Sequence, residues 1–191
     1  MNYLKSSIGW VTLGAIVMAS LMVPAGQAAA QGFFNRGASG DDDLVSIVRN
    51  TSARFRDIDV AYAEGYVQSL GCISAPAEGA MGQHLMKPSL VDGVLDATQP
   101  EMLVYEPRRN GTMRLVAVDF LIFYDAWHAN HDFPPALAGQ NFFLVDSPNS
   151  FGAPVFYTLH VWAFKYNPNG AFAMWNPRVS CSTFGPYGDR F

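Results

Sequence analysis

Four histidines and a few aspartates are the residues of this sequence best suited to chemistry. The histidines are His84, His128, His131 and His160, and the aspartates considered with them are Asp119, Asp125 and Asp132. Imidazole and carboxylate groups bind divalent metal ions and transfer protons near neutral pH. Their spacing matches no local motif such as H-E-x-x-H, G-x-S-x-G, a Walker loop or an EF-hand. Function therefore depends on which of them the fold brings together.

His84, Asp119 and His160 are the candidate metal ligands. Asp119 interrupts an apolar strand pattern, and a buried carboxylate needs a cation, a metal or several donors to offset its desolvation. His160 lies between aromatic residues in another extended segment, where a core histidine bonded to backbone or to a carboxylate is the alternative. If the three meet, they form a site suited to a divalent metal with open positions.

Two methionines flank His84 in the sequence. Thioether sulfur together with imidazole is a ligand set that suits Cu(I). Met81 and Met86 are separated by an odd number of residues, however, so in a regular strand they point to opposite faces. The spacing therefore favours core packing of both methionines.

His128, His131 and Trp162 are candidate ligand-binding residues. His128 and His131 are three positions apart and share a face if that stretch is one helical turn, while a polar loop end is the alternative. With a neighbouring aspartate they could bind zinc or contact a ligand at the mouth of a pocket. Trp162 follows His160 by two residues, so in an extended segment it lies on the same face.

The first 30 residues have the pattern of a signal peptide. Lys5 supplies positive charge, residues 10–23 are mostly apolar, and Ala28-Ala29-Ala30 forms a cleavage site. A retained transmembrane helix is the competing interpretation, but Pro24 interrupts a run that falls short of the ~20 residues needed to span a bilayer. We expect a secreted or periplasmic protein with no stable membrane anchor, a flexible leader at 31–40 and a single domain at 41–191.

Composition restricts the class of protein and of partner. Hydrophobic residues make up 50% of the chain and charged ones 15%, which excludes a disordered chain or a coiled coil. The net charge of −4 argues against nucleic acid as a partner. Cys72 and Cys181 are the only two cysteines, and in an exported protein such a pair predicts one disulfide.

The chain pattern predicts one helix followed by strands. Apolar residues at helical spacing begin after Ser39 and end near Gly65, which predicts an amphipathic helix. Asn110-Gly111 predicts a type I′ turn between strands at 102–106 and 112–124, with Leu103 beside Val118 and Tyr105 beside Val116. The second of these strands is apolar on both faces, which predicts a central position in the sheet.

The pattern of the remaining residues predicts further strands and a loop. Residues 155–166 and 171–175 are expected to be strands, and 127–139 a surface loop. The fold class is α+β, with the N-terminal amphipathic helix packed on a largely antiparallel sheet that is either open or curled towards a barrel.

Several sequence blocks resemble those of a family of secreted bacterial proteins whose function is uncharacterised. The blocks are Gly79-Ala80-Met81-Gly82 with His84, Leu103-Val104-Tyr105-Glu106-Pro107, Ala126-Trp127-His128-Ala129 with His131, Leu159-His160-Val161-Trp162, and Trp175-Asn176-Pro177 with Val179-Ser180-Cys181. They lie within residues 66–182. The resemblance implies export and brings no activity with it.

Three functional hypotheses follow. The first is an exported binding module for a small molecule or metal ion, with His84, Asp119 and His160 in a pocket and His128 and His131 near its rim. The second is an enzyme in which a divalent metal on the same residues activates water, with His128 or His131 as general acid or base. The third is an envelope protein that packs against a partner or its own copy.

Overall fold

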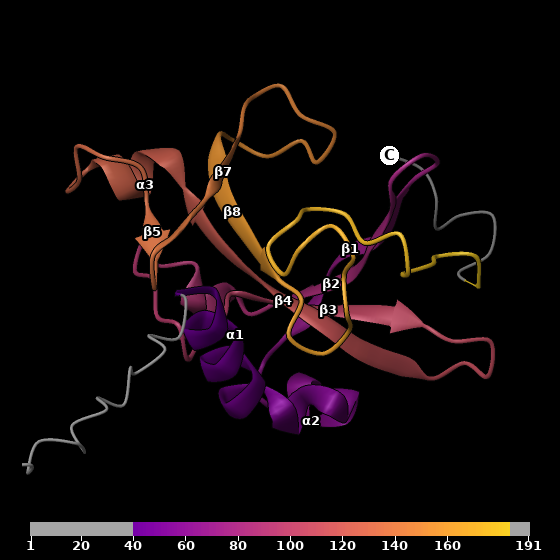
Figure 1. Ribbon diagram of the computed structural model, residues 1–191. Helices are drawn as coiled ribbons and strands as arrows, with labels where there is room; N and C mark the ends of the chain where they lie inside the picture. Colours follow the sequence, from indigo (N-terminus) through magenta and orange to yellow (C-terminus); the bar gives the residue numbers. More distant parts are fainter. Residues whose placement is uncertain (1–39, 184–191) are drawn as a thin grey trace, which may run out of the picture. The chain divides into compact units, whose positions relative to one another are not determined.

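The computed structural model describes residues 40–183, which form a six-stranded antiparallel sheet with short helices beside it (Figure 1). The strand order is β1-β2-β3-β4-β8-β7, and β5 pairs with β6 in a separate hairpin. The strands are β1 (Val67–Ala75), β2 (Gly79–Met86), β3 (Met102–Pro107), β4 (Met113–Phe123), β5 (Ala136–Leu137), β6 (Gln140–Asn141), β7 (Phe143–Val145) and β8 (Phe156–Val161). The mixed fold with a largely antiparallel sheet is confirmed. Strands β1 and β7 are the edges of this sheet, which curves into a half-barrel.

Three helical segments occupy the stretch for which the sequence predicted one helix. They are α1 (Gly40–Thr51), the 3-10 helix η1 (Ala53–Arg56) and α2 (Ile58–Ala63). The expectation of a single helix was wrong, because buried Ser52 ends α1 and extended Asp57 separates η1 from α2. The Asp57 carboxylate accepts a hydrogen bond from the Asp59 amide and so caps α2. Two further helical segments are η2 (Pro88–Leu90) and α3 (Tyr124–His128).

Side chains are buried on both faces of the sheet, as the apolar pattern of the long strand predicted. Along β4, Val118 and Phe120 belong to a cluster that includes Leu44 and Val48 of α1. Leu121 alternates with them and belongs to a separate cluster on the opposite face. β4 lies between β3 and β8, so the central position is confirmed.

The β3–β4 hairpin differs from its prediction at the turn end. Leu103 does pair with Val118, but a bulge after Val104 pairs Tyr105 with Leu115 instead of Val116. The turn is not type I′, since Gly111 has a positive φ and Asn110 does not. The Gly111 amide donates to the Arg108 carbonyl, which gives a longer turn closed by a glycine bulge.

Two further expectations about strands need correction. β8 ends at Val161, so residues 162–166 are not strand, and residues 171–175 do not return as one. The last segment is instead held beside β2 by paired backbone hydrogen bonds between Ala80 and Asn176. The expected loop at 127–139 contains the end of α3 and strand β5, while β6 follows directly after it.

The predicted disulfide between Cys72 and Cys181 is present. The two Cα atoms are 5.6 Å apart across a sequence separation of 109 residues, so the bond ties β1 to the last described segment. Within residues 40–183 no helix is long and apolar enough to cross a membrane. The predicted signal peptide and nearly all of the expected leader lie outside the described residues.

Gly82 lets β2 approach β3 closely. Its φ is +112°, and a Cβ there would lie 2.7 Å from the Tyr105 carbonyl oxygen. Gly170 has nearly the same φ, +111°, but a Cβ there would meet nothing within 4 Å. Substitutions at the two glycines therefore separate two destabilising effects: an unfavourable φ, and a clash between the new Cβ and the neighbouring strand.

We expect Gly82→Ala to destabilise the protein by about 2 kcal/mol more than Gly170→Ala, because both pay for positive φ but only the first forces backbone atoms apart. Chemical denaturation of the two variants and the wild type measures the difference. Equal losses in the two variants would show that the approach of β2 to β3 is not constrained at Gly82.

Candidate metal centre

Three polar side chains from separate strands converge on one face of the sheet. His84 comes from β2, Asp119 from β4 and His160 from β8, and Asp119 and His160 are directly opposite each other in the β4–β8 ladder. Their exposed fractions are only 2%, 4% and 4%. One ligand atom from each residue lies within 4.8 Å of the others. The structure thus brings together the three residues that the sequence analysis grouped.

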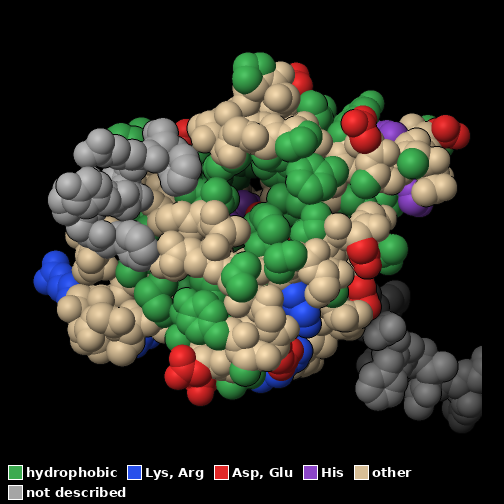
Figure 2. Space-filling model, turned by 180° about the vertical axis from the view of Figure 1, so that it is seen from behind, with side chains coloured by type: hydrophobic (Ala, Val, Ile, Leu, Met, Phe, Trp, Pro, Cys, Tyr) green, Lys and Arg blue, Asp and Glu red, His purple; other side chains and the backbone are tan. Residues whose placement is uncertain are grey.

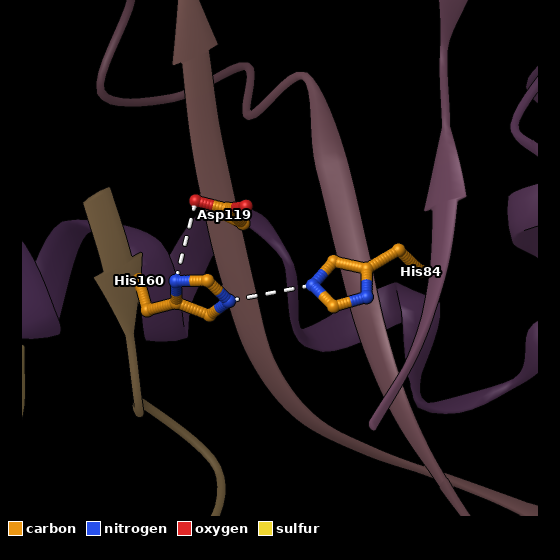
Figure 3. A group of neighbouring side chains, drawn as sticks. All are labelled: His84, Asp119 and His160. Atoms are coloured by element: carbon orange, nitrogen blue, oxygen red, sulfur yellow. Dashed lines mark hydrogen bonds and ion pairs between the residues drawn. The ribbon is translucent and has the colours of Figure 1, made fainter. Parts of the chain in front are cut away.

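Asp119, His160 and His84 contact one another in that sequence (Figure 3). His84 Nε2 lies 3.3 Å from His160 Nε2, and the two rings are perpendicular. The other nitrogen of His160, Nδ1, faces Asp119 Oδ1 at 3.6 Å. His160 therefore lies between the carboxylate and the second imidazole and turns one nitrogen to each.

The meeting of the imidazoles requires a curved sheet. Strands β3 and β4 lie between β2 and β8, and neighbouring strands are about 4.8 Å apart. On a flat sheet the backbones of His84 and His160 would thus be separated by about 14 Å with parallel side chains. A contact of 3.3 Å is possible only because this face of the sheet is concave.

Burial sets the charges of the group. Desolvation lowers the pKa of His84 to about 4, with help from His160, and lowers the pKa of His160 to about 4. Desolvation raises the pKa of Asp119 to about 6, against the opposing effect of His84 and a hydrogen bond from Thr158. At neutral pH the site therefore contains two neutral imidazoles and one carboxylate, the protonation states that metal binding requires.

The contacts also assign the positions of the ring protons. With Asp119 ionised, His160 carries its proton on Nδ1, and His84 then donates from Nε2 to the bare His160 Nε2. This tautomer leaves His84 Nδ1 without a proton. That buried atom has no direct hydrogen-bond partner among the described residues, although the nearby Gly82 backbone acts to raise the pKa of the ring. Such a group needs an explanation, and a bound water or ion is one of those available.

Asp119 is held by a neighbour that the sequence analysis did not assign to the site. The Thr158 hydroxyl donates to Asp119 Oδ1 at 2.5 Å. Thr158 and His160 are alternate residues on β8, so they extend from the same face. The hydroxyl gives the carboxylate one partner in addition to the ring of His160.

A cavity of about 190 Å³ opens over the group. Figure 2 shows a hollow rimmed mostly by hydrophobic side chains, with a histidine visible inside it. The lining side chains are Ser69, Leu70, Ile73, Met81, His84, Met86, Met102, Asp119, Leu121, Phe123, Val145, Phe151, Ala153, Phe156, Thr158, His160 and Met174. The cavity has apolar walls and one small polar area.

Met81 and Met86 both line this cavity, so the expectation that they point to opposite faces was wrong. In the β1–β2 ladder Ile73 pairs with Gly82 and Ser74 with Ala80, which leaves Met81 without a partner. This bulge, next to the positive φ of Gly82, breaks the two-residue alternation. Met81 thereby joins His84 and Met86.

The other predicted ligand-binding residues lie elsewhere. His128 Nε2 is 3.0 Å from the Tyr157 hydroxyl, and Tyr157 belongs to the cluster on the opposite face of the sheet. The ring of His131 stacks on Trp127 at 3.7 Å. Neither histidine lines the cavity, so the structure does not place them at its rim.

Trp162 is beside the site but not in the cavity. Its ring is 6.2 Å from that of His160, and its Nε1 donates to the Ala173 carbonyl at 2.5 Å. It packs in the cluster that contains the disulfide. Trp162 directly follows the last residue of β8, so it lies beside the site on the side of His160.

Comparisons with protein-family models, with curated proteins and with solved structures found no match.

Glu101 is a buried carboxyl that the sequence analysis missed. It is 1% exposed, and its Oε2 accepts a hydrogen bond from the Leu121 amide. Burial raises its pKa to about 8. Its position before β3 carries no pattern that marks burial, since the three residues before it are polar or proline.

The raised pKa of Glu101 predicts a pH-dependent stability. The pKa of Glu101 is about 4.5 in the unfolded chain and about 8 in the folded one, so the folded state holds the proton more tightly. The resulting contribution to stability is complete below the unfolded pKa and is lost as the pH rises through about 8. We expect Glu101→Gln to be more stable than the wild type at pH 9, by an amount on the order of a few kcal/mol, with no such advantage at pH 4. Urea denaturation at both pH values measures this, with exposed Glu78→Gln as the control. A Glu101→Gln effect that is the same at both pH values would contradict the assignment.

Proposed function

We propose that this protein is an exported binding protein that holds a metal ion between His84 and His160 at the base of an apolar cavity. The observation that supports this is the Nε2 to Nε2 distance of 3.3 Å. Two nitrogen ligands at about 2.0–2.1 Å from a tetrahedral ion are separated by about 3.3 Å. The two imidazoles therefore already have the separation that a shared ion requires.

Asp119 is assigned the role of orienting His160. The carboxylate faces Nδ1, whereas the ion would bind Nε2 on the other side of the ring. A carboxylate behind a ligating histidine fixes its tautomer and makes it a stronger ligand. Direct ligation by Asp119, as in the three-ligand site that the sequence suggested, is the alternative and requires His160 to turn.

The cavity favours a binding function over an enzymatic one. Its walls can enclose an apolar or aromatic group next to the ion. The enzyme hypothesis assigned acid and base roles to His128 and His131, and both are placed away from the cavity. Among the lining residues, Asp119 is the one carboxylate that could transfer a proton, and it already contacts His160.

The proposal also covers the compartment of the protein and the role of helix α1. We assign the protein to the secreted or periplasmic space on the signal-like N-terminus, and the disulfide fits an oxidising compartment. We also propose that the chain belongs to the secreted family that its sequence blocks resemble. Helix α1 is assigned to the support of the sheet, since Leu44 and Val48 pack on the face away from the cavity.

Metal titration of untagged, chelator-treated protein tests the proposal. We expect one Zn²⁺ or Cu⁺ per chain in competition with a chromophoric chelator, and an affinity at least 100-fold lower in His84→Ala and in His160→Ala, since each loses a ligand. Asp119→Asn should lower affinity by about 10–100-fold, as removal of an orienting carboxylate does.

His131→Ala is the matched control, because His131 is exposed and lies outside the cavity. Thermal melts of each variant establish that it is folded. Absence of stoichiometric binding of either ion by the wild type, or equal affinity in the His84→Ala and His131→Ala variants, would contradict the proposed function.

A further inference from the structure

We propose that the ion held in this cavity is Cu(I), bound by the two imidazoles together with methionine sulfur; this inference rests on the proposed function and identifies its metal. Four of the five methionines in residues 40–183 line the cavity: Met81, Met86, Met102 and Met174. They come from β2, β3 and the segment after β8. Chance core packing does not require them to share a single cavity with both buried histidines.

The sheet register places two of these methionines in line with the site. Met86 is opposite Met102, Met102 is opposite Asp119, and Asp119 is opposite His160. The four residues form one row across β2, β3, β4 and β8, on the face that lines the cavity. His84 is the next residue of β2 on that face.

Met102 is the thioether best placed to reach an ion between the imidazoles. The two rings meet across β3 and β4, and Met102 and Asp119 are the members of the row on these two strands. Met102 is buried, so its sulfur is shielded from solvent. Met86, which is directly opposite Met102 in the ladder, is the second candidate.

The chemistry of these donors selects a soft ion. Thioethers are weak ligands for Zn²⁺, Mn²⁺ and Mg²⁺, but together with imidazole they favour Cu(I). Both imidazoles are buried, so few water molecules can reach an ion between them and compete as oxygen ligands. A set of two neutral nitrogens and one or two sulfurs meets the low coordination number of a monovalent d¹⁰ ion.

Charge balance points to the same ion. Asp119 is the single charged side chain among the lining residues. A monovalent cation beside one carboxylate leaves the buried site neutral, whereas a divalent cation leaves one uncompensated positive charge. Because the cost of burying net charge in an apolar medium is large, the monovalent ion is favoured.

Parallel affinities for Cu⁺ and Zn²⁺ test the inference. Cu⁺ is measured without oxygen, under reducing conditions, against bicinchoninate, and Zn²⁺ against a chromophoric chelator. We expect Met102→Leu to lower the Cu⁺ affinity by about tenfold or more while changing the Zn²⁺ affinity by less than about threefold, and a Met86→Leu, Met102→Leu double variant to lower Cu⁺ affinity further. Leucine has nearly the volume of methionine, so the cavity stays filled.

Met113→Leu is the control, because Met113 packs against the cluster on the opposite face of the sheet. Copper-edge X-ray absorption of the wild type provides a reading that does not depend on any variant, and sulfur among the nearest neighbours supports the inference. Cu⁺ affinity that is unchanged in the double variant, or absence of sulfur neighbours, overturns the inference but leaves the proposed function in place. Failure of the wild type to bind either ion overturns both.

Discussion

Curvature of the sheet is the constraint on which the site depends. His84 and His160 belong to strands that two others separate, yet their Nε2 atoms are 3.3 Å apart. A bulge after Val104 lies in β3, between the two strands, and bulges of this kind bend a sheet. The helix side of the sheet fills with apolar residues such as Val118 and Phe120, and this leaves the inner face to form the cavity. A flatter sheet with the same residues in the same strands would keep the two imidazoles apart.

Burial of polar groups on the inner face is costly. Asp119, His84 and His160 are all nearly inaccessible to water, and one nitrogen of His84 has no direct hydrogen-bond partner within residues 40–183. Apolar residues of similar size would relieve that desolvation. A bound cation changes the balance, because it offsets the charge of Asp119 and turns the neutral imidazoles into ligands. The proposed binding function would therefore account for a polar group that folding stability alone does not favour.

Several features could be predicted because they depend on local pattern or on simple counting. The cysteine pair, the register of Leu103 with Val118 and the central position of β4 follow from compartment, turn position and apolar alternation. Asp119 attracts attention because a carboxylate interrupts an apolar strand. The grouping of His84 with His160 was a hypothesis from residue type, and the curvature that realises it has no signature in residue spacing.

The features that were missed depend on breaks in regular structure. Met81 joins the cavity through a bulge, which the odd spacing from Met86 cannot reveal. His128 lies away from the site because α3 directs it to Tyr157. Glu101 is buried by chain packing beyond its own segment, as its bond to the Leu121 amide shows. In each case tertiary contacts override the local pattern.

The most direct test of the account is a ¹⁵N NMR spectrum of the histidine side chains with and without one equivalent of metal ion. Without metal, we expect His160 to be protonated on Nδ1 and His84 on Nε2. With the ion bound, both rings should carry the proton on Nδ1 and both Nε2 signals should shift together. Metal binding that leaves the signals of either His84 or His160 unchanged would contradict a shared site between them.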